Sequence, residues 1–420
     1  MIQTTELLPG VTLRVFPADR FKQNSLTVQF VRPMSEAEAS YNALLPAVLL
    51  RGCRSTPDLR AITLRLDDLY GASVGAVNRR VGDYHATGLS CRFISDQFAL
   101  KGDRIMASAV EFLGELLLEP VLEAGAFRPD YVALEKSNLL NAIKAQKNDK
   151  RSWCVTQMLR QMCRADSFGI SRLGEKEKVI RIQPQDLYDH YRKLLAESRI
   201  EVFYVGQDPE GQLPTLLRNM FRQIERRYVN LPPQTHFCSA GGGEYTETQK
   251  VIQGKLCMGF SSDIDLRGEG FAAMQVCNEI FGSGMTSKLF VQVREKRSLC
   301  YDIGSHFHGS KGIMVVSAGI DNDKDQLVKD QVLTQLEEVC HGRITDEELL
   351  AAKQALVSDL RGVHDSTGSI EGYYAIAALS GLRWTPAEYI AAIEQVDKAA
   401  VAAAARTLKL DTVYFLKGEQ

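Results

Sequence analysis

The stretch YRKLLAESRIEVFYVG at residues 191–206 and the stretch AARTLKLDTVYFLKG at residues 404–418 show the same order of features. Each contains a helical pattern, a short turn, an apolar strand and a final glycine. Asp186 and Asp397 stand near the start of the two matching helices. We interpret the match as an internal duplication of about 200 residues per copy, a period much longer than that of a solenoid repeat.

Strand patterns with a period of two and long helical patterns recur in both halves of the chain. They predict an α+β fold with two homologous domains, each a mainly antiparallel sheet packed against helices. Between the halves lies NLPPQTHFCSAGGGEYT, whose prolines and glycine triplet favour an extended or flexible path. We therefore expect a first domain at residues 1–229, a linker at residues 230–246 and a second domain at residues 247–420.

Composition excludes several classes of function. The 420 residues carry 50 basic and 52 acidic side chains without a basic block, so we expect no nucleic-acid partner. The longest apolar runs fall short of the roughly 18 residues of a spanning helix, and MIQTTELLPG has no signal-peptide pattern, so we expect no membrane partner. Nine cysteines lie scattered without a CxxC pair. This usage favours a reducing compartment, and we expect a cytoplasmic protein.

The stretch VREKRSLCY contains two side chains that suit the binding of a carbonyl group. Arg294 lies in the last turn of a predicted helix that begins after FGSGM, with Thr286 as its predicted cap, and Tyr301 opens the next predicted strand. A helix end and a tight turn can bring a guanidinium and a phenol to the same side. Such a pair offers donor hydrogens and no fixed negative charge, which suits a peptide carbonyl or an oxyanion better than a metal.

A purely structural interpretation of the same residues stays open. In that case Arg294 forms an ion pair at the helix end with Glu295 or Asp302, and Tyr301 is half-buried in a sheet. Taken without any resemblance to known proteins, these residues favour the structural interpretation.

The longer stretch IFGSGMTSKLFVQVREKRSLCYDIGS, residues 280–305, resembles the second-domain signature of the pitrilysin/insulinase family of zinc metallopeptidases, the inverzincins. In that signature, glycines precede a helix that ends in an Arg, and a Tyr follows seven residues later. The duplication, the glycine-rich linker and the length are similar to the two-domain members, which include mitochondrial processing peptidase subunits and bacterial heterodimeric peptidases. The resemblance covers essentially the whole chain.

The family's zinc motif, H-x-x-E-H, has no match in this chain. In the family, two His one turn apart hold zinc and the Glu activates water, and a short apolar stretch and a glycine follow. That following stretch corresponds here to VLLRGC, which places the motif on ALLPA. Its first His then falls on Ala43, its Glu on Pro46 and its second His on Ala47, and none of these can bind zinc or take a proton.

The family's third ligand is a Glu that follows a supporting Glu by seven residues on a later helix. Here Glu135 stands at the supporting place and Ala142 at the ligand place. We expect no metal in this chain and a merely solvated or capping role for Glu135. The segment YNALLPAVLL should keep the packing role of the zinc helix, begun or kinked at Pro46 because proline disturbs a helix interior.

The resemblance implies a non-catalytic, substrate-binding subunit of a heterodimeric zinc peptidase. In the two-domain members, the zinc of one chain faces the Arg/Tyr pair of the other across a closed chamber. Zinc and base are then expected on a homologous partner, and Arg294 and Tyr301 are expected to hold a peptide or a small unfolded protein. This chain alone should be inactive.

Two alternatives remain. The first is a scaffold or peptide-binding homodimer without proteolytic role, similar to the core subunits of respiratory complexes. The second is a relocated metal site at His306 and His308, which lie two apart on a predicted strand and can face the same side.

Overall fold

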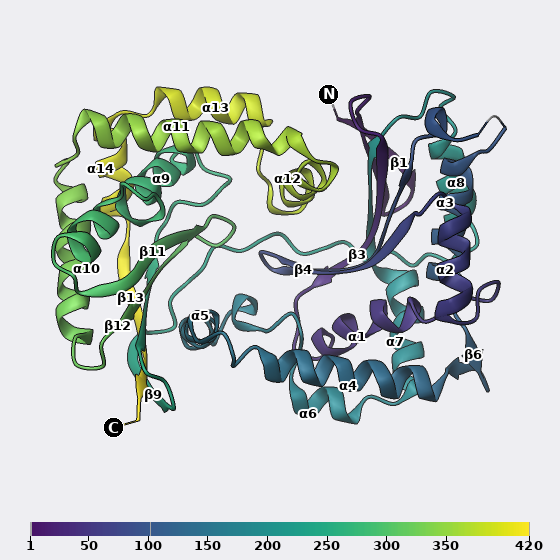
Figure 1. The fold of residues 1–420 in the computed structure, drawn as a ribbon, viewed down its shortest axis with the longest axis horizontal. Coiled ribbons are helices and arrows are strands. Elements are labelled where there is room, and N and C mark those ends of the chain that lie inside the picture. Colours follow the sequence, from purple (N-terminus) through teal and green to yellow (C-terminus); the bar gives the residue numbers. More distant parts are fainter. Residues whose placement is uncertain (1, 101, 420) are drawn as a thin grey trace. The chain divides into compact units, whose positions relative to one another are not determined.

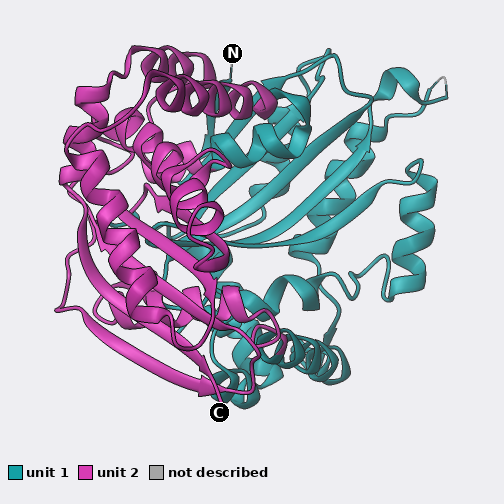
Figure 2. Ribbon diagram, turned by 60° about the vertical axis from the view of Figure 1, so that its left-hand side comes forward, with its two compact units in different colours: residues 1–144, 170–233, 364–375 teal, residues 145–169, 234–363, 376–420 magenta. Residues whose placement is uncertain are grey.

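The structure is a computed structural model that describes residues 2–100 and 102–419 (Figure 1). Its residues group into two compact units (Figure 2). Unit 1 comprises residues 1–144, 170–233 and 364–375, and unit 2 comprises residues 145–169, 234–363 and 376–420. Residues 145–169, from the first half of the sequence, therefore belong to unit 2, which is built mainly from the second half. Residues 364–375, from the second half, belong to unit 1. The domains expected from the sequence, residues 1–229 and 247–420 with a linker at residues 230–246, remain a prediction.

The sheet of unit 1 has six strands in the order β1-β2-β8-β3-β5-β4. β2 and β8 run parallel, and all other neighbours are antiparallel. The strands are β1 (Gln3–Leu8), β2 (Val11–Pro17), β3 (Gln23–Pro33), β4 (Ser73–Val81), β5 (Tyr84–Ile94) and β8 (Arg199–Gly206). A separate short hairpin is formed by β6 (Leu122–Glu123) and β7 (Ala126–Phe127).

The sheet of unit 2 has five strands in the order β11-β12-β10-β13-β9. β9 and β13 run parallel, and the remaining pairs are antiparallel. Read from β9, this order and these directions equal those of β2-β8-β3-β5-β4, so β1 is the addition in unit 1. The strands are β9 (Gly243–Gln249), β10 (Gly254–Ser261), β11 (Cys300–His308), β12 (Ile313–Ile320) and β13 (Lys409–Gly418). β8 and β13, the strands that revealed the repeat in the sequence, occupy equivalent positions, and the predicted α+β fold with two homologous domains is confirmed.

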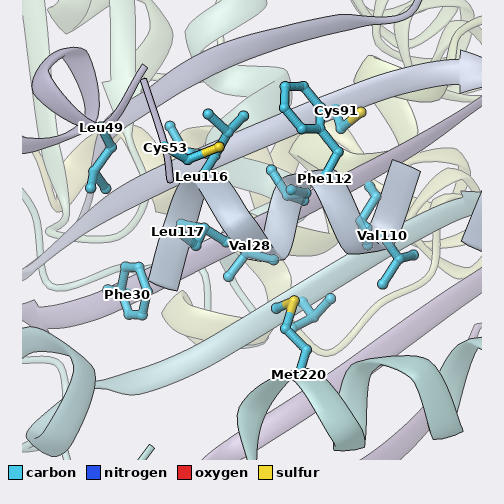
Figure 3. Packing of buried hydrophobic residues seen from close by; sticks show 14 of the residues in the cluster. Val28, Phe30, Leu49, Cys53, Cys91, Val110, Phe112, Leu116, Leu117 and Met220 are labelled. Carbon is cyan, nitrogen blue, oxygen red and sulfur yellow. The ribbon is translucent and has the colours of Figure 1, made fainter. Parts of the chain in front are cut away.

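The core of unit 1 lies between one face of its sheet and a layer of helices (Figures 1 and 3). β3 contributes Leu26, Val28 and Phe30 to this face, and α3 contributes apolar residues that include Phe112 and Leu116. Burial of such side chains contributes about 25 cal/mol per Å² of apolar surface. The helices are α1 (Ala39–Leu49), α2 (Leu59–Asp68), α3 (Ile105–Leu118), α4 (Pro129–Ala145), α6 (Lys176–Arg181), α7 (Pro184–Glu197) and α8 (Leu213–Phe221).

In unit 2, α5 packs on the sheet through Cys154, Met158 and Met162, which contact a cluster that includes Cys257 and Tyr414. α5 (Lys150–Met162) precedes the rest of the unit in the sequence. The other helices are α9 (Phe271–Asn278), α10 (Asp325–Cys340), α11 (Asp346–Gly362), α12 (Thr367–Ser380), α13 (Pro386–Gln395) and α14 (Lys398–Arg406). The first half of α12 belongs to unit 1, where Ile370 packs against Ala18 and Val205.

Helix α1 contains Pro46 in its interior and begins at Ala39, so the expectation of a helix begun at Pro46 is wrong. Proline lacks the N–H that would bind the carbonyl of Asn42, a defect that costs about 3 kcal/mol in a helix interior. The Thr87 hydroxyl, buried on β5, donates a hydrogen bond to this Asn42 carbonyl at 2.7 Å. The freed carbonyl is therefore satisfied by the sheet, and the helix continues through the proline.

We predict that Thr87→Val lowers the free energy of unfolding by about 1–3 kcal/mol, because it leaves the Asn42 carbonyl buried without a donor. Pro46→Ala restores a main-chain N–H at that carbonyl, so the same Thr87 substitution should cost less in the Pro46→Ala background. Urea denaturation of the four proteins measures both effects. Thr63→Val, an exposed helix position, is the control and should change stability by no more than about 0.5 kcal/mol. An equal cost of Thr87→Val in both backgrounds would refute the compensation.

Candidate functional site

The positions that correspond to the zinc motif carry no metal-binding atoms. Ala43 and Ala47 lie one turn apart on α1 and are half-buried, and Pro46 is buried. Ala142 lies on α4 and is exposed. Methyl groups and a proline ring offer neither a ligand nor a base, so the family's hydrolytic chemistry has no place in this unit.

Glu135 is buried and ion-paired, which corrects the expectation of a solvated or capping carboxylate. Only 7% of its surface is exposed. The guanidinium of Arg51, two residues after α1, binds one carboxylate oxygen, and the amide of Asn138 donates to the other at 3.0 Å. A buried carboxylate needs such partners because its desolvation is costly. Glu135 therefore ties α4 to the end of α1.

A buried polar network holds α1 from its inner side. The amide oxygen of Asn42 lies 2.8 Å from Nε2 of His190 on α7, and its amide nitrogen lies 3.3 Å from Nδ1 of His85 on β5. Nε2 of His85 lies 2.7 Å from the amide oxygen of Asn78 on β4. Burial lowers the pKa of both histidines to about 4. They are thus neutral near pH 7 and join three elements to α1 without a metal.

This network predicts an acid-sensitive fold. The unfolded chain takes up protons at His85 and His190 near their ordinary pKa of 6.5, whereas the folded chain does so only near pH 4. Their contribution to stability is therefore complete above pH 6.5 and is lost as the pH falls towards 4. We expect the urea midpoint to fall between pH 6.5 and pH 5, and we expect a smaller fall in His190→Gln. An unchanged slope in that variant would contradict the assignment.

Arg294 lies in a π-helical segment, Leu289–Glu295, which follows a second one, Glu279–Ser283, at the end of α9. Such segments are rare in proteins, and those that occur often lie at functional sites. The N-cap of the second segment is Lys288 and not Thr286 as predicted, and the hydroxyl of the preceding Ser287 accepts a hydrogen bond from the N–H of Phe290. The Arg294 guanidinium lies over the Phe290 ring at 4.5 Å from its centroid.

The ion pair that the structural interpretation expected for Arg294 does not form. Asp302 instead binds Arg151 at 3.6 Å and Lys255 at 3.4 Å. Within the described ranges 2–100 and 102–419, Arg294 has no ion-pair partner, and its guanidinium lies over the ring of Phe290. A half-buried guanidinium with open donors can bind a carbonyl or carboxylate oxygen.

Tyr301 opens the edge strand β11 and is 54% exposed, so the half-buried position of the structural interpretation is wrong as well. Its hydroxyl donates to Oδ1 of Asp321 at 2.9 Å, and Lys324 binds the same carboxylate at 2.6 Å. The hydrogen bond to Asp321 raises the pKa of Tyr301, because it favours the protonated phenol. To donate to another molecule, the phenol has to release Asp321.

The structure brings Arg294 and Tyr301 to one short segment of unit 2 without joining them. Each is occupied by a different neighbour, and among the described residues no hydrogen bond or ring contact connects the two. Each side chain carries a hydrogen-bond donor near the start of the edge strand β11.

His306 and His308 do approach each other on β11, with ring centroids 4.6 Å apart and the rings nearly perpendicular. His308 also packs edge-on against Phe168. Among the residues that the structure describes, no group of three or more His, Cys, Asp or Glu is placed to hold a metal ion. The pair therefore has no third ligand to complete a site.

Sequence reasoning missed the partners of these residues. Asp321 and Thr87 lie far along the chain from Tyr301 and Pro46, and only the folded sheets bring them near. The signal for a polar sheet face was present in SLTVQF on β3, where hydroxyl and amide side chains alternate with apolar ones.

Known proteins that are similar to this chain include peptidase M16 homologues. Residues 181–356 match the peptidase M16 inactive domain. The probable inactive metalloprotease YmfF of Bacillus subtilis is 27% identical over 411 residues, which cover 98% of this chain and 96% of that protein. The chain is thus similar over nearly its whole length to an M16 peptidase homologue described as probably inactive, and M16 is the pitrilysin/insulinase family that the sequence signature resembles.

Solved structures show the same fold. A conserved protein from Enterococcus faecalis is 27% identical with a TM-score of 0.93, and the match covers 100% of this chain and 99% of that one. A peptidase M16 inactive domain from Pseudomonas fluorescens, 18% identical over 100% of this chain and 98% of its own, shares the fold with a TM-score of 0.82. Among the described residues, no helix has the length and apolar character needed to cross a bilayer.

We predict that the purified chain holds no zinc, because Ala43, Ala47 and Ala142 supply no ligands. Elemental analysis after dialysis against metal-free buffer is the measurement. One tightly held zinc per chain, lost in His306→Ala or His308→Ala, would instead establish the relocated site.

Proposed function

We propose that this chain is a non-catalytic, substrate-binding subunit of a heterodimeric zinc peptidase that acts on peptides or small unfolded proteins. The zinc and the general base reside on a homologous partner with an intact H-x-x-E-H motif. This chain supplies Arg294 and Tyr301, whose donors hold the scissile carbonyl and the oxyanion that develops from it. The nine cysteines, scattered without a CxxC pair, support a cytoplasmic location.

One contrast carries the proposal. Every position of the zinc site has changed to alanine or proline, yet Arg294 keeps its charge without an ion-pair partner among the described residues. A cation kept without a carboxylate inside its own chain is available to an oxygen atom of another molecule. Tyr301, exposed at the start of an edge strand, supplies a second donor once it leaves Asp321.

A second candidate function is a scaffold or peptide-binding homodimer without a proteolytic role. The hydrogen bond of Tyr301 to Asp321 and the stacking of Arg294 on Phe290 favour it, because both side chains then serve packing within this chain. The two functions differ in whether the loss of these side chains affects catalysis by a mixed complex.

We predict that Arg294→Ala and Tyr301→Phe each lower turnover by about a hundredfold or more, the usual effect of removing one donor to a developing oxyanion. This chain is mixed with a homologous subunit that carries H-x-x-E-H, and cleavage of a quenched fluorescent peptide is measured. Arg297→Ala is the matched control, because Arg297 is exposed nearby and bonds only to the main chain of Gln292 among the described residues. It should leave turnover unchanged.

Gel filtration of each mixture checks that the complex still assembles. This chain alone should cleave nothing in any version. If both substitutions leave the assembled complex fully active, Arg294 and Tyr301 are packing residues, and the scaffold function replaces the proposed one.

A further inference from the structure

The polar face of the unit 1 sheet contains a cavity of about 280 Å³ that the zinc-site comparison does not involve. Strands β3, β4 and β5 form its floor, and the first turns of α12 form a wall. It is lined by Ser25, Thr27, Ala76, Val77, Asn78, Arg79, Ser90, Arg92, Gly368 and Glu371. All of these residues belong to unit 1.

Two hydroxyl groups at the floor of this cavity have no hydrogen-bond partner among the residues that the structure describes. Ser25 and Thr27 lie opposite Arg92 and Ser90 in the sheet register, on the face that is turned away from the apolar core. They are only 5% and 3% exposed, and within residues 2–100 and 102–419 neither hydroxyl makes a hydrogen bond. Both residues line the cavity, so their hydroxyls can donate hydrogen bonds to a molecule that enters it.

The charge in the cavity is positive. Glu371 is neutralised, because Arg79 binds it at 3.1 Å and the Gln29 amide donates to it at 2.7 Å. Arg92 has no ion-pair partner in the described chain, and it is therefore the lining residue whose charge is uncompensated. The site thus combines a free guanidinium with unpaired hydroxyl donors, which suits an anion.

The start of α12 adds to this preference and leaves room for the ligand. Gly368 lies in the first turn of α12, where main-chain N–H groups and the helix dipole favour negative charge. A β-carbon at this position would lie 3.4 Å from the Arg92 guanidinium. Glycine therefore keeps the space beside the guanidinium open.

We propose that this cavity is a subsite for an oxyanion and that its ligand is the C-terminal carboxylate of a peptide. Arg92 pairs with the carboxylate, and the hydroxyls of Ser25 and Thr27 donate to it. The cavity lies slightly below the usual range for drug-sized ligands, which fits one terminal residue and not a larger molecule. The choice of a peptide as the source of the carboxylate rests on the proposed function, whereas the oxyanion site does not.

Fluorescence anisotropy with the full isolated chain tests the proposal. The probes are a short labelled peptide with a free C-terminal carboxylate and the same peptide with a C-terminal amide. We expect the acid to bind at least about tenfold tighter than the amide, and we expect Arg92→Gln to abolish this difference. Arg60→Gln, a substitution of an exposed arginine on α2, is the control and should preserve it.

Thr27→Val separates binding from folding. Valine keeps the shape of threonine and removes an unpaired hydroxyl, so we expect weaker binding of the acid with no loss of thermal stability. Equal affinity for acid and amide, or wild-type preference in Arg92→Gln, would overturn the site. Arg92-dependent binding of inorganic phosphate without peptide binding would overturn the peptide assignment. Because no partner or cleavage is involved, either failure is distinguishable from failure of the proposed function.

Discussion

The hydrogen bond from Thr87 to the Asn42 carbonyl is the interaction on which unit 1 depends, because it allows helix α1 to continue through Pro46. In a zinc peptidase, this helix would be fixed by its metal. Here the same helix is fixed from its inner side by the Asn42–His85–His190 network and at its end by the Arg51–Glu135 pair. The outer face can then carry Ala43 and Ala47 without loss of the fold. Helix α1 thus serves packing in this chain, where in a zinc peptidase it would hold the metal.

Unit 2 repeats the strand order of unit 1 and carries the two side chains that we propose to bind a substrate. Arg294 and Tyr301 lie around the start of an edge strand, where their donors are accessible. Neither can activate water, so they are useful for hydrolysis only next to a metal held by another chain. In the proposed function, contacts with an aromatic ring and with the Asp321 carboxylate leave both donors able to bind an incoming oxygen atom, which a buried ion pair would prevent.

Much of the fold and of the candidate site could be predicted from the sequence, because the patterns that indicate them lie within short stretches of the chain. The repeat of a helix, an apolar strand and a glycine predicted the duplicated α+β fold, and the spacing around ALLPA and VREKR located Ala43, Pro46, Ala47, Arg294 and Tyr301. Long-range contacts could not be predicted. No local pattern connects Thr87 with Pro46, Arg51 with Glu135 or Asp321 with Tyr301, and the exposures expected for Glu135 and Tyr301 were wrong. The grouping of residues 145–169 with unit 2 also depends on packing that a single sequence does not encode locally.

The central claim is that this chain completes a catalytic site whose metal lies on another chain. Its most direct test is a titration of this chain into a fixed amount of a homologous zinc-bearing subunit, with peptide cleavage as the readout. The account predicts that activity rises linearly, stops rising at an equimolar ratio and disappears when a chelator removes the zinc. Cleavage by this chain alone, or by the mixture in excess chelator, would contradict the account.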